Sequence, residues 1–181
     1  MTRKETTAFL GQLLEKDLAV LGRHFAKEVT VDYGSIWNKR IDYMEFVPEN
    51  GLCVSGIEKG IFVCYEVKSC RDDIFSGKGL NFLGEKNYIV TTMETYKQIE
   101  QDIKEGSLNN HIRAVNPESS LSYGIIVAVP DGRTAKTEYE NPTPLDSSCK
   151  WHLQVMKKSQ SLLRKRSTVE LLFCMLRSNK C

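Results

Sequence analysis

Residues 60–70, GIFVCYEVKSC, place the acid-x-lysine triplet Glu66-Val67-Lys68 directly after an uninterrupted apolar run. The run 61–65 is rich in β-branched and aromatic residues and lacks polar alternation, which is typical of a central strand covered on both faces. Such a strand needs a layer of other elements on each side. We therefore predict an α/β fold, with a mixed central β-sheet flanked by helices.

The neighbouring segments supply the other elements of this core. Apolar residues recur at helical spacing over residues 7–25, which predicts an amphipathic first helix. Short β-branched or alternating runs predict strands within 28–34, 39–47, 87–92 and 122–130, and residues 93–106 predict a helix that ends at Gly106. Residues 1–130 are expected to form the α/β core.

The remainder of the chain has a different character. Residues 131–149 are polar and contain two prolines, so we expect an exposed connection. Residues 150–181 carry eight basic residues against the single acid Glu170, and we expect a basic helical tail that packs on the core. One helix is predicted over 151–163, and another from Thr168, where Ser167 and Glu170 have capping-box spacing.

The composition of the chain limits the classes of protein to which it can belong. A chain of 181 residues with 41% hydrophobic content suits one globular domain. The N-terminal residues are polar and no apolar run approaches the roughly 18 residues of a membrane span, so we expect a cytoplasmic protein without membrane contact. The six cysteines form no Cys-x-x-Cys pair, and no His stands at zinc-finger spacing from them, which favours reduced thiols and no zinc.

The chain contains two acid-x-lysine triplets, and their context separates them. Asp102-Ile103-Lys104 falls within the helix predicted over 93–106, where residues two apart point in different directions. Glu66 and Lys68 fall on a strand, so they share one face. Asp42 alternates on a preceding predicted strand and would reach the same point if the two strands pair. An acid and a lysine at the end of a buried strand are costly unless they are paired or bound to something.

This order of elements resembles the PD-(D/E)xK, restriction-endonuclease-like superfamily. The matching segments are LLEKDL, KRIDYMEF and IFVCYEVKS, and NYIVTT and YGIIVAVP fit the later strands of the core. The resemblance covers residues 7 to about 130 and lies in element order more than in any single motif. Ile41 stands where the superfamily pattern has a proline before the Asp. The chain also resembles small stand-alone members from phages and mobile elements.

The resemblance implies a site for Mg²⁺ or Mn²⁺. Asp42 and Glu66 would bind the metal with the Val67 carbonyl, and Glu15 would be a further ligand, for which Glu5 is a rival. Lys68 would position or deprotonate the attacking water, so the implied catalytic residues are Asp42, Glu66 and Lys68. The structural alternative is an ion pair in which Lys68 bridges the two acids.

Two groups of residues are candidates for binding DNA or a partner. The glycine-rich segment 75–86 carries Lys78 and Lys86, whose ammonium groups would approach a phosphate, although a flexible turn explains the glycines equally well. It lacks the Gly-Lys-Ser/Thr end of a P-loop, so we expect no nucleotide cofactor. The C-terminal candidates are Lys157, Lys158, Arg164, Lys165 and Arg166. These residues would neutralise DNA phosphates or meet an acidic protein equally well.

The resemblance implies a metal-dependent DNA endonuclease, or a nuclease-derived DNA-binding protein, of phage or mobile-element type. The alternative is a non-enzymatic anti-defence inhibitor that binds a CRISPR effector or its DNA, and a third option is a phage structural or assembly protein. A phage-encoded protein would act in the host cytoplasm. Because superfamily members often dimerise to cut both strands, a homodimer is one expected arrangement.

Overall fold

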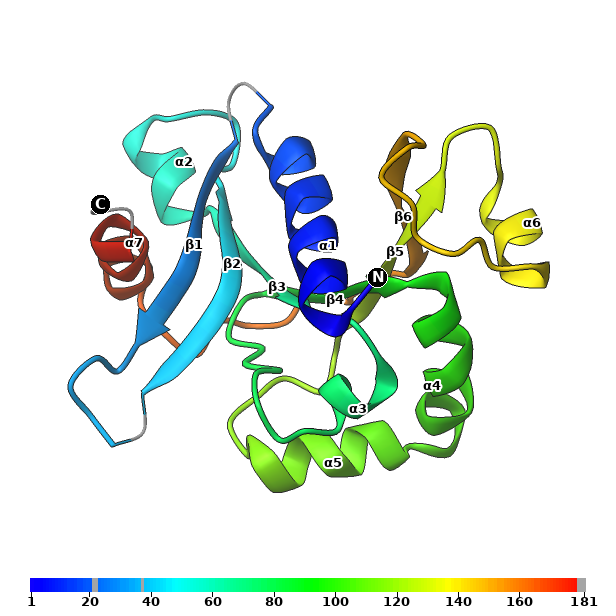
Figure 1. Ribbon diagram of the computed structural model, residues 1–181. Coiled ribbons are helices and arrows are strands. Elements are labelled where there is room, and N and C mark those ends of the chain that lie inside the picture. The colour runs from blue at the N-terminus through cyan, green and yellow to red at the C-terminus, as the bar shows by residue number, and fades with distance from the viewer. Residues whose placement is uncertain (21–22, 37, 179–181) are drawn as a thin grey trace.

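The computed structural model describes residues 1–20, 23–36 and 38–178, which form a six-stranded sheet with helices on both faces (Figure 1). The strands lie side by side in chain order: β1 (His24–Val31), β2 (Lys39–Val47), β3 (Ile61–Val67), β4 (Lys86–Thr92), β5 (Gly124–Pro130) and β6 (Trp151–Lys157). β1, β2 and β3 are antiparallel neighbours, β3, β4 and β5 are parallel, and β6 runs antiparallel to β5. The expected mixed α/β sheet is confirmed.

Helices make the parallel connections and cover the sheet. The short α3 (Arg71–Ile74) lies between β3 and β4, whereas α4 (Met93–Glu105) and α5 (Ser107–Val115) lie between β4 and β5. The helix expected over 93–106 is confirmed and ends at Gly106, whose φ of 80° is left-handed. The other helices are α1 (Arg3–Leu18), α2 (Val54–Glu58), α6 (Ala135–Glu140) and α7 (Thr168–Ser178).

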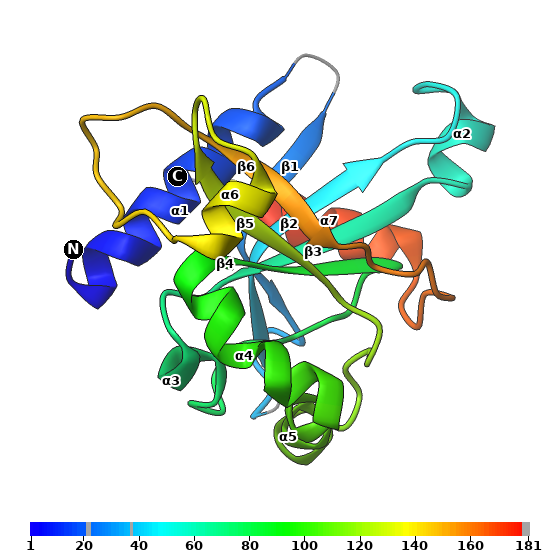
Figure 2. The same ribbon diagram turned by 90° about the vertical axis from the view of Figure 1, so that its right-hand side faces the viewer.

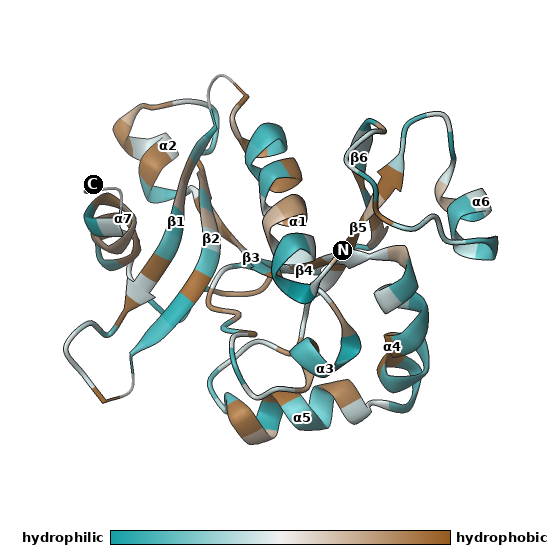
Figure 3. Ribbon diagram, in the orientation of Figure 1, coloured by the Kyte–Doolittle hydropathy of each residue, from teal (hydrophilic) through white to brown (hydrophobic). Residues whose placement is uncertain are grey.

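The helices divide between the two sheet faces (Figures 1 and 2). Helix α1 packs Leu10, Leu14 and Leu18 on one face, against residues such as Val63 and Val90. Helices α4 and α5 cover β4 and β5 on the other face, and α7 covers β1 and β2 there. Figure 3 shows teal and brown bands alternating along α1, α4 and α5, as expected of helices with one face on a core.

The first helix lies earlier in the chain than expected. It begins after Thr2, which forms a capping box with Glu5, and it ends at Leu18. Residues 24 and 25 belong to β1, and residues 21 and 22 lie outside the described part of the chain. The apolar residues near the start of β1 continue the helical spacing by coincidence, because a strand places Phe25 toward the same core.

The helix expected over 151–163 is wrong. Residues Trp151–Lys157 form β6, which pairs with β5 and completes the sheet. Trp151 and Val155 are four apart, a spacing that suits a helix, but they also alternate with polar neighbours as in a strand. Trp151 packs edge-on against Phe9 of α1, with 5.9 Å between ring centroids. The C-terminal segment 150–181 is therefore not a wholly helical tail, and its residues 179–181 lie outside the described residues.

The second C-terminal helix is confirmed as α7, and Ser167 Oγ accepts a hydrogen bond from the Glu170 N–H at 3.1 Å. The segment 131–149 is mostly exposed but contains α6, in which Glu138 is buried. The five described cysteines are free thiols, and Cys181 lies outside the described residues. Within the described residues, no helix combines the length and the apolar character needed to cross a membrane.

Candidate functional site

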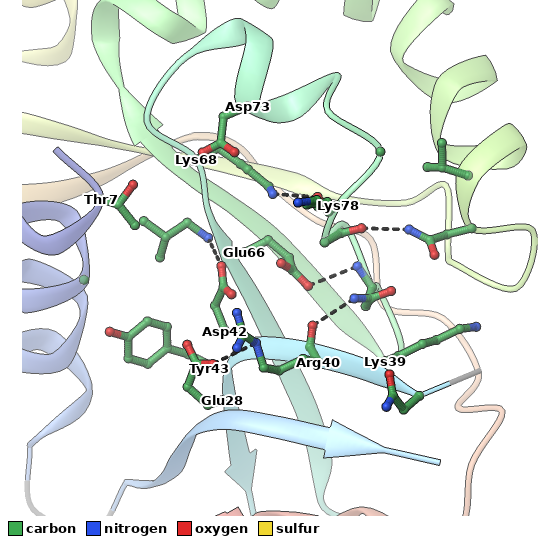
Figure 4. Close-up of a pocket in the computed structure, with 18 of the residues that line it drawn as sticks. Thr7, Glu28, Lys39, Arg40, Asp42, Tyr43, Glu66, Lys68, Asp73 and Lys78 are labelled. Atoms are coloured by element: carbon green, nitrogen blue, oxygen red, sulfur yellow. Dashed lines mark hydrogen bonds and ion pairs between the residues drawn. The ribbon is translucent and has the colours of Figure 1, made fainter. Parts of the chain in front are cut away.

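A groove of about 1700 Å³ runs between three parts of the molecule. One wall is the β1–β2 hairpin, the second is formed by the turn 77–81 and the segment 115–118 at the C-terminal end of α5, and α1 lines the third side (Figure 4). The ends of β2 and β3 meet inside it, so Asp42, Glu66 and Lys68 all line this groove. The structure therefore brings together the three residues that the sequence placed on adjacent strands.

The pairing of β2 with β3 sets the positions of Asp42 and Glu66. Because Tyr43 pairs with Tyr65 in the antiparallel register, Asp42 and Glu66 stand side by side on the same face. Asp42 Oδ2 accepts a hydrogen bond from the Val67 N–H at 2.8 Å, which fixes the carboxylate at the end of β3.

Glu66 is fully buried, and its two carboxylate oxygens differ in their hydrogen bonding. Oε1 accepts a hydrogen bond from the Asn81 N–H at 3.0 Å. Oε2 is buried without a hydrogen-bond partner among the described residues. An unpaired buried carboxylate oxygen is costly, so a native protein keeps one only where something else binds it or where it has a chemical role.

Burial disfavours negative charge on both acids. Burial, together with the neighbouring Asp42 carboxylate, raises the pKa of Glu66 to about 8, although the Lys68 charge opposes the rise. Burial also raises the pKa of Asp42, against the opposing effects of the Val67 hydrogen bond and the Lys68 charge. Both acids therefore bind a proton more readily than exposed carboxyl groups do, and a cation bound beside them would favour their charged forms.

Lys68 is 5% exposed, and its ammonium group donates to the main-chain carbonyl of Lys78 at 2.8 Å. No carboxylate oxygen of the described residues forms an ion pair with it within 4 Å, so the bridged ion pair with Asp42 and Glu66 is not formed. An ammonium group has three donors, and two of these have no acceptor in the described part of the chain. Lys68 is held at the site by the backbone and keeps donors for another group.

The glycine-rich turn closes over these side chains. Gly79 has a left-handed φ of 71°, and a Cβ atom there would lie 2.7 Å from Glu66 Oε2 and 2.8 Å from Lys68 Nζ. Asn116 Nδ2 donates to the Gly79 carbonyl at 2.7 Å, and Asn81 Nδ2 donates to the Arg40 carbonyl at 2.8 Å. Both asparagines position the turn, and neither carries a sequence signal that identifies its role.

The two glutamates proposed as further ligands have different places. Glu15 lines the groove, but its Oε1 already accepts from the Tyr43 hydroxyl at 2.8 Å and from Lys27 Nζ at 3.1 Å. Glu5 is exposed and accepts a hydrogen bond from the Thr2 N–H at the start of α1. Within the described ranges, no three His, Cys, Asp or Glu side chains form a group that could hold a metal. Of the predicted ligands that the structure describes, Asp42 and Glu66 stand side by side in the groove, whereas Glu15 is already hydrogen-bonded to Tyr43 and Lys27.

Of the predicted basic residues, Lys78 and Arg166 line the groove. Arg164 instead pairs with Glu85 at 2.8 Å and lies over the Phe62 ring, so it supports the core. Lys157 is half-buried with its ammonium 4.1 Å from the Tyr123 ring centroid.

The other three predicted basic residues also lie apart from the lining of the groove. Lys86 is half-buried at the start of β4, and Lys158 is exposed after β6. Lys165 is exposed and donates to the Glu118 carbonyl at 2.8 Å. The C-terminal cations are therefore distributed over several environments.

No family model, curated protein or solved structure matches this chain significantly.

Proposed function

We propose that this protein is a divalent-metal-dependent phosphodiesterase that cuts DNA and has a restriction-endonuclease-like core. The observation that carries the proposal is the buried Glu66 Oε2, which has no partner among the described residues and lies beside Asp42 in an open groove. Lys68 reaches the same point from the same strand face, and its free donors suit a phosphate or a water.

The arrangement of elements supports the restriction-endonuclease-like assignment. A helix precedes three antiparallel strands, and β4 adds parallel to β3. The Asp stands on the second strand and the Glu-x-Lys ends the third, as the superfamily pattern requires. Ile41 stands where the superfamily pattern has a proline, and it fits this position because its side chain is fully buried in the core.

The residues fit Mg²⁺ or Mn²⁺, which favour oxygen ligands. Magnesium is commonly held by one or two carboxylates, with waters and substrate phosphates completing its coordination. Asp42 and Glu66 supply two carboxylates, and the unpartnered Glu66 oxygen is available as a ligand. When bound, the metal would supply Lewis-acid polarisation of the phosphate and make water nucleophilic near neutral pH.

The protein's own groups have separate roles in hydrolysis. Asp42 and Glu66 would hold the metal cation next to the reacting phosphate. Lys68 donates to a phosphate oxygen or to the attacking water and stabilises the negative charge that grows in the transition state. The attacking water gives up one proton to solvent as its oxygen forms the new P–O bond, the P–O bond to the leaving nucleotide breaks, and the leaving oxygen takes a proton from solvent.

The test is cleavage of supercoiled, linear and single-stranded DNA with Mg²⁺ or Mn²⁺. The variants Glu66→Gln and Lys68→Ala are compared with Lys104→Ala, which makes the matching change in the second triplet. Lys104 is exposed and pairs with Glu100 on α4, so its variant should cut as the wild type does. Removal of metal or of either groove residue should abolish cutting, whereas equal cutting by all three variants would refute the proposal.

The alternative is a non-enzymatic inhibitor that binds a CRISPR effector or its DNA through the same fold. It predicts no metal-dependent cutting and unchanged partner binding in Glu66→Gln. Co-purification with an effector complex, lost on charge reversal of exposed basic residues such as Lys158 and Lys165, would favour it.

A further inference from the structure

One end of the groove is crossed by an ion pair between its two walls. Glu118, from the segment after α5, places Oε2 2.7 Å from Nζ of Lys39 on β2. The Glu118 side chain is 64% exposed, whereas that of Lys39 is 16% exposed. The cation is therefore built into the wall, and the acid reaches it from the solvent side.

Arg166 lies at the same place. Its guanidinium makes two hydrogen bonds to Asp32, at 3.0 and 2.8 Å, and a third to Glu170 at 3.1 Å. Its Nη2 is also 3.9 Å from Glu118 Oε2. Asp32 and Glu170 thus hold Arg166 in position without Glu118, and a single anionic oxygen lies within reach of both Arg166 and Lys39.

We infer that Lys39 and Arg166 form a binding site for a DNA backbone phosphate, and that the Glu118 carboxylate occupies this site as an internal competitor in the free protein. The nature of the polyanion rests on the proposed function. The site lies in the groove that contains Asp42 and Glu66. Lys39 precedes Asp42 by three strand residues, about 10 Å, which is the axial rise of about three nucleotides.

The exchange of Glu118 for a phosphate is chemically favourable. The Glu118 carboxylate is 64% exposed, so solvent screens its contact with Lys39 and hydrates the carboxylate when it leaves. A phosphodiester offers two non-bridging oxygens that share one negative charge, so it can accept from the ammonium and the guanidinium together. Glu118 would then swing into solvent, and the groove would lose one negative charge where the DNA enters.

The experiment measures binding of a fluorescent duplex by anisotropy without divalent metal, so that cleavage cannot interfere. Wild type, Glu118→Gln, Lys39→Ala and the double variant are compared from about 50 to 200 mM salt. The control is Glu49→Gln, which removes the same charge from an exposed glutamate 4.0 Å from Lys59, outside the groove lining.

Glu118→Gln should bind about three- to fivefold more tightly, as expected for removal of one exposed competing ion pair. Lys39→Ala should bind more weakly and reduce the salt slope by about one phosphate contact. The double variant should lose the gain, and Glu49→Gln should resemble the wild type.

The inference is overturned if Glu118→Gln binds no tighter than wild type, if the gain persists in the double variant, or if no variant binds DNA. These outcomes are separate from failure of the proposed function. Cleavage that depends on Glu66 but not on Glu118 would leave the nuclease intact without the phosphate site. Tighter binding by Glu118→Gln without any metal-dependent cleavage would support the phosphate site and refute the nuclease.

Discussion

The Val67 N–H donates a hydrogen bond to Asp42 Oδ2 at 2.8 Å, at the point where β3 ends. This bond ties an acid of one strand to the backbone of the next and leaves Asp42 beside Glu66. Among the described residues, the neighbouring carboxylate of Glu66 has a hydrogen-bond partner for Oε1 and none for Oε2. The site therefore has one acid fixed by the backbone and one with an oxygen available to a cation.

Asp42→Asn should separate the structural role of Asp42 from its charge. Asparagine keeps an oxygen that can accept from Val67, so the free energy of unfolding should change by less than about 1 kcal/mol. Loss of a metal-binding carboxylate should weaken Mn²⁺ binding by at least about tenfold. Calorimetric titration measures this, with Asp102→Asn as the control because Asp102 pairs with Arg71 outside the groove. Unchanged Mn²⁺ affinity in Asp42→Asn would remove Asp42 from the site.

The raised pKa of Glu66 should make the metal-free protein less stable at high pH. Its pKa is about 8 when folded and near 4.5 when unfolded, so the native state binds more protons between these values. This contribution to stability is full below about pH 4.5 and is lost as pH rises through about 8. Glu66→Gln cannot ionise, so at pH 8 it should be more stable than wild type, on the order of 2 kcal/mol.

Denaturant unfolding in EDTA at pH 5.5 and pH 8 tests this prediction. Glu45→Gln is the control, because Glu45 is equally buried but accepts from Arg23 at 2.7 Å and from the Tyr65 hydroxyl at 2.7 Å. Glu45→Gln should destabilise at both pH values. A Glu66→Gln variant with the same loss of stability toward pH 8 as wild type would contradict the account.

Gly79→Ala should damage the site in a way that Gly106→Ala does not. Both glycines have a left-handed φ, so backbone strain should make each substitution cost about 1 kcal/mol of stability, and the side-chain overlap at Gly79 adds to that cost there. A Cβ at Gly106 would meet open space, whereas one at Gly79 would press on Glu66 and Lys68. Only Gly79→Ala should also lose metal binding and DNA cleavage, both measured on folded protein. Equal activity of the two variants would show that the turn does not control the site.

Arg164→Ala should act on stability. Its removal leaves Glu85 without its charge partner, at a position where the two side chains are only 18% and 10% exposed. The free energy of unfolding should fall by about 2–3 kcal/mol, whereas Lys158→Ala, at an exposed site, should change it by less than about 0.5 kcal/mol. Thermal and denaturant unfolding measure both. A stable Arg164→Ala with weakened DNA binding would restore the role that the sequence predicted for it.

The strands and the acid–lysine cluster could be predicted because strand geometry is simple. Residues two apart share a face, so Glu66 and Lys68 had to point together once residues 61–65 were recognised as a strand. The position of Asp42 beside Glu66 could be predicted because consecutive strands commonly pair in sheets.

The remaining features depend on contacts between distant segments. The spacing of Trp151 and Val155 suits a helix, and only the exposed edge of β5 makes that segment a strand. The pairing of Arg164 with Glu85 joins residues 79 positions apart, so the composition of the C-terminal segment suggested a free basic surface. The approach of Gly79 to Glu66 likewise depends on how a turn folds back over the strand.

Titration of the wild-type protein with Mn²⁺ tests the metal site without any knowledge of the substrate. We expect a Mn²⁺ site that is lost in Asp42→Asn and Glu66→Gln and retained in Lys104→Ala, with protons released on binding because Glu66 must ionise. Absence of Mn²⁺ binding by the folded wild type, or binding that survives both acid substitutions, would contradict this expectation.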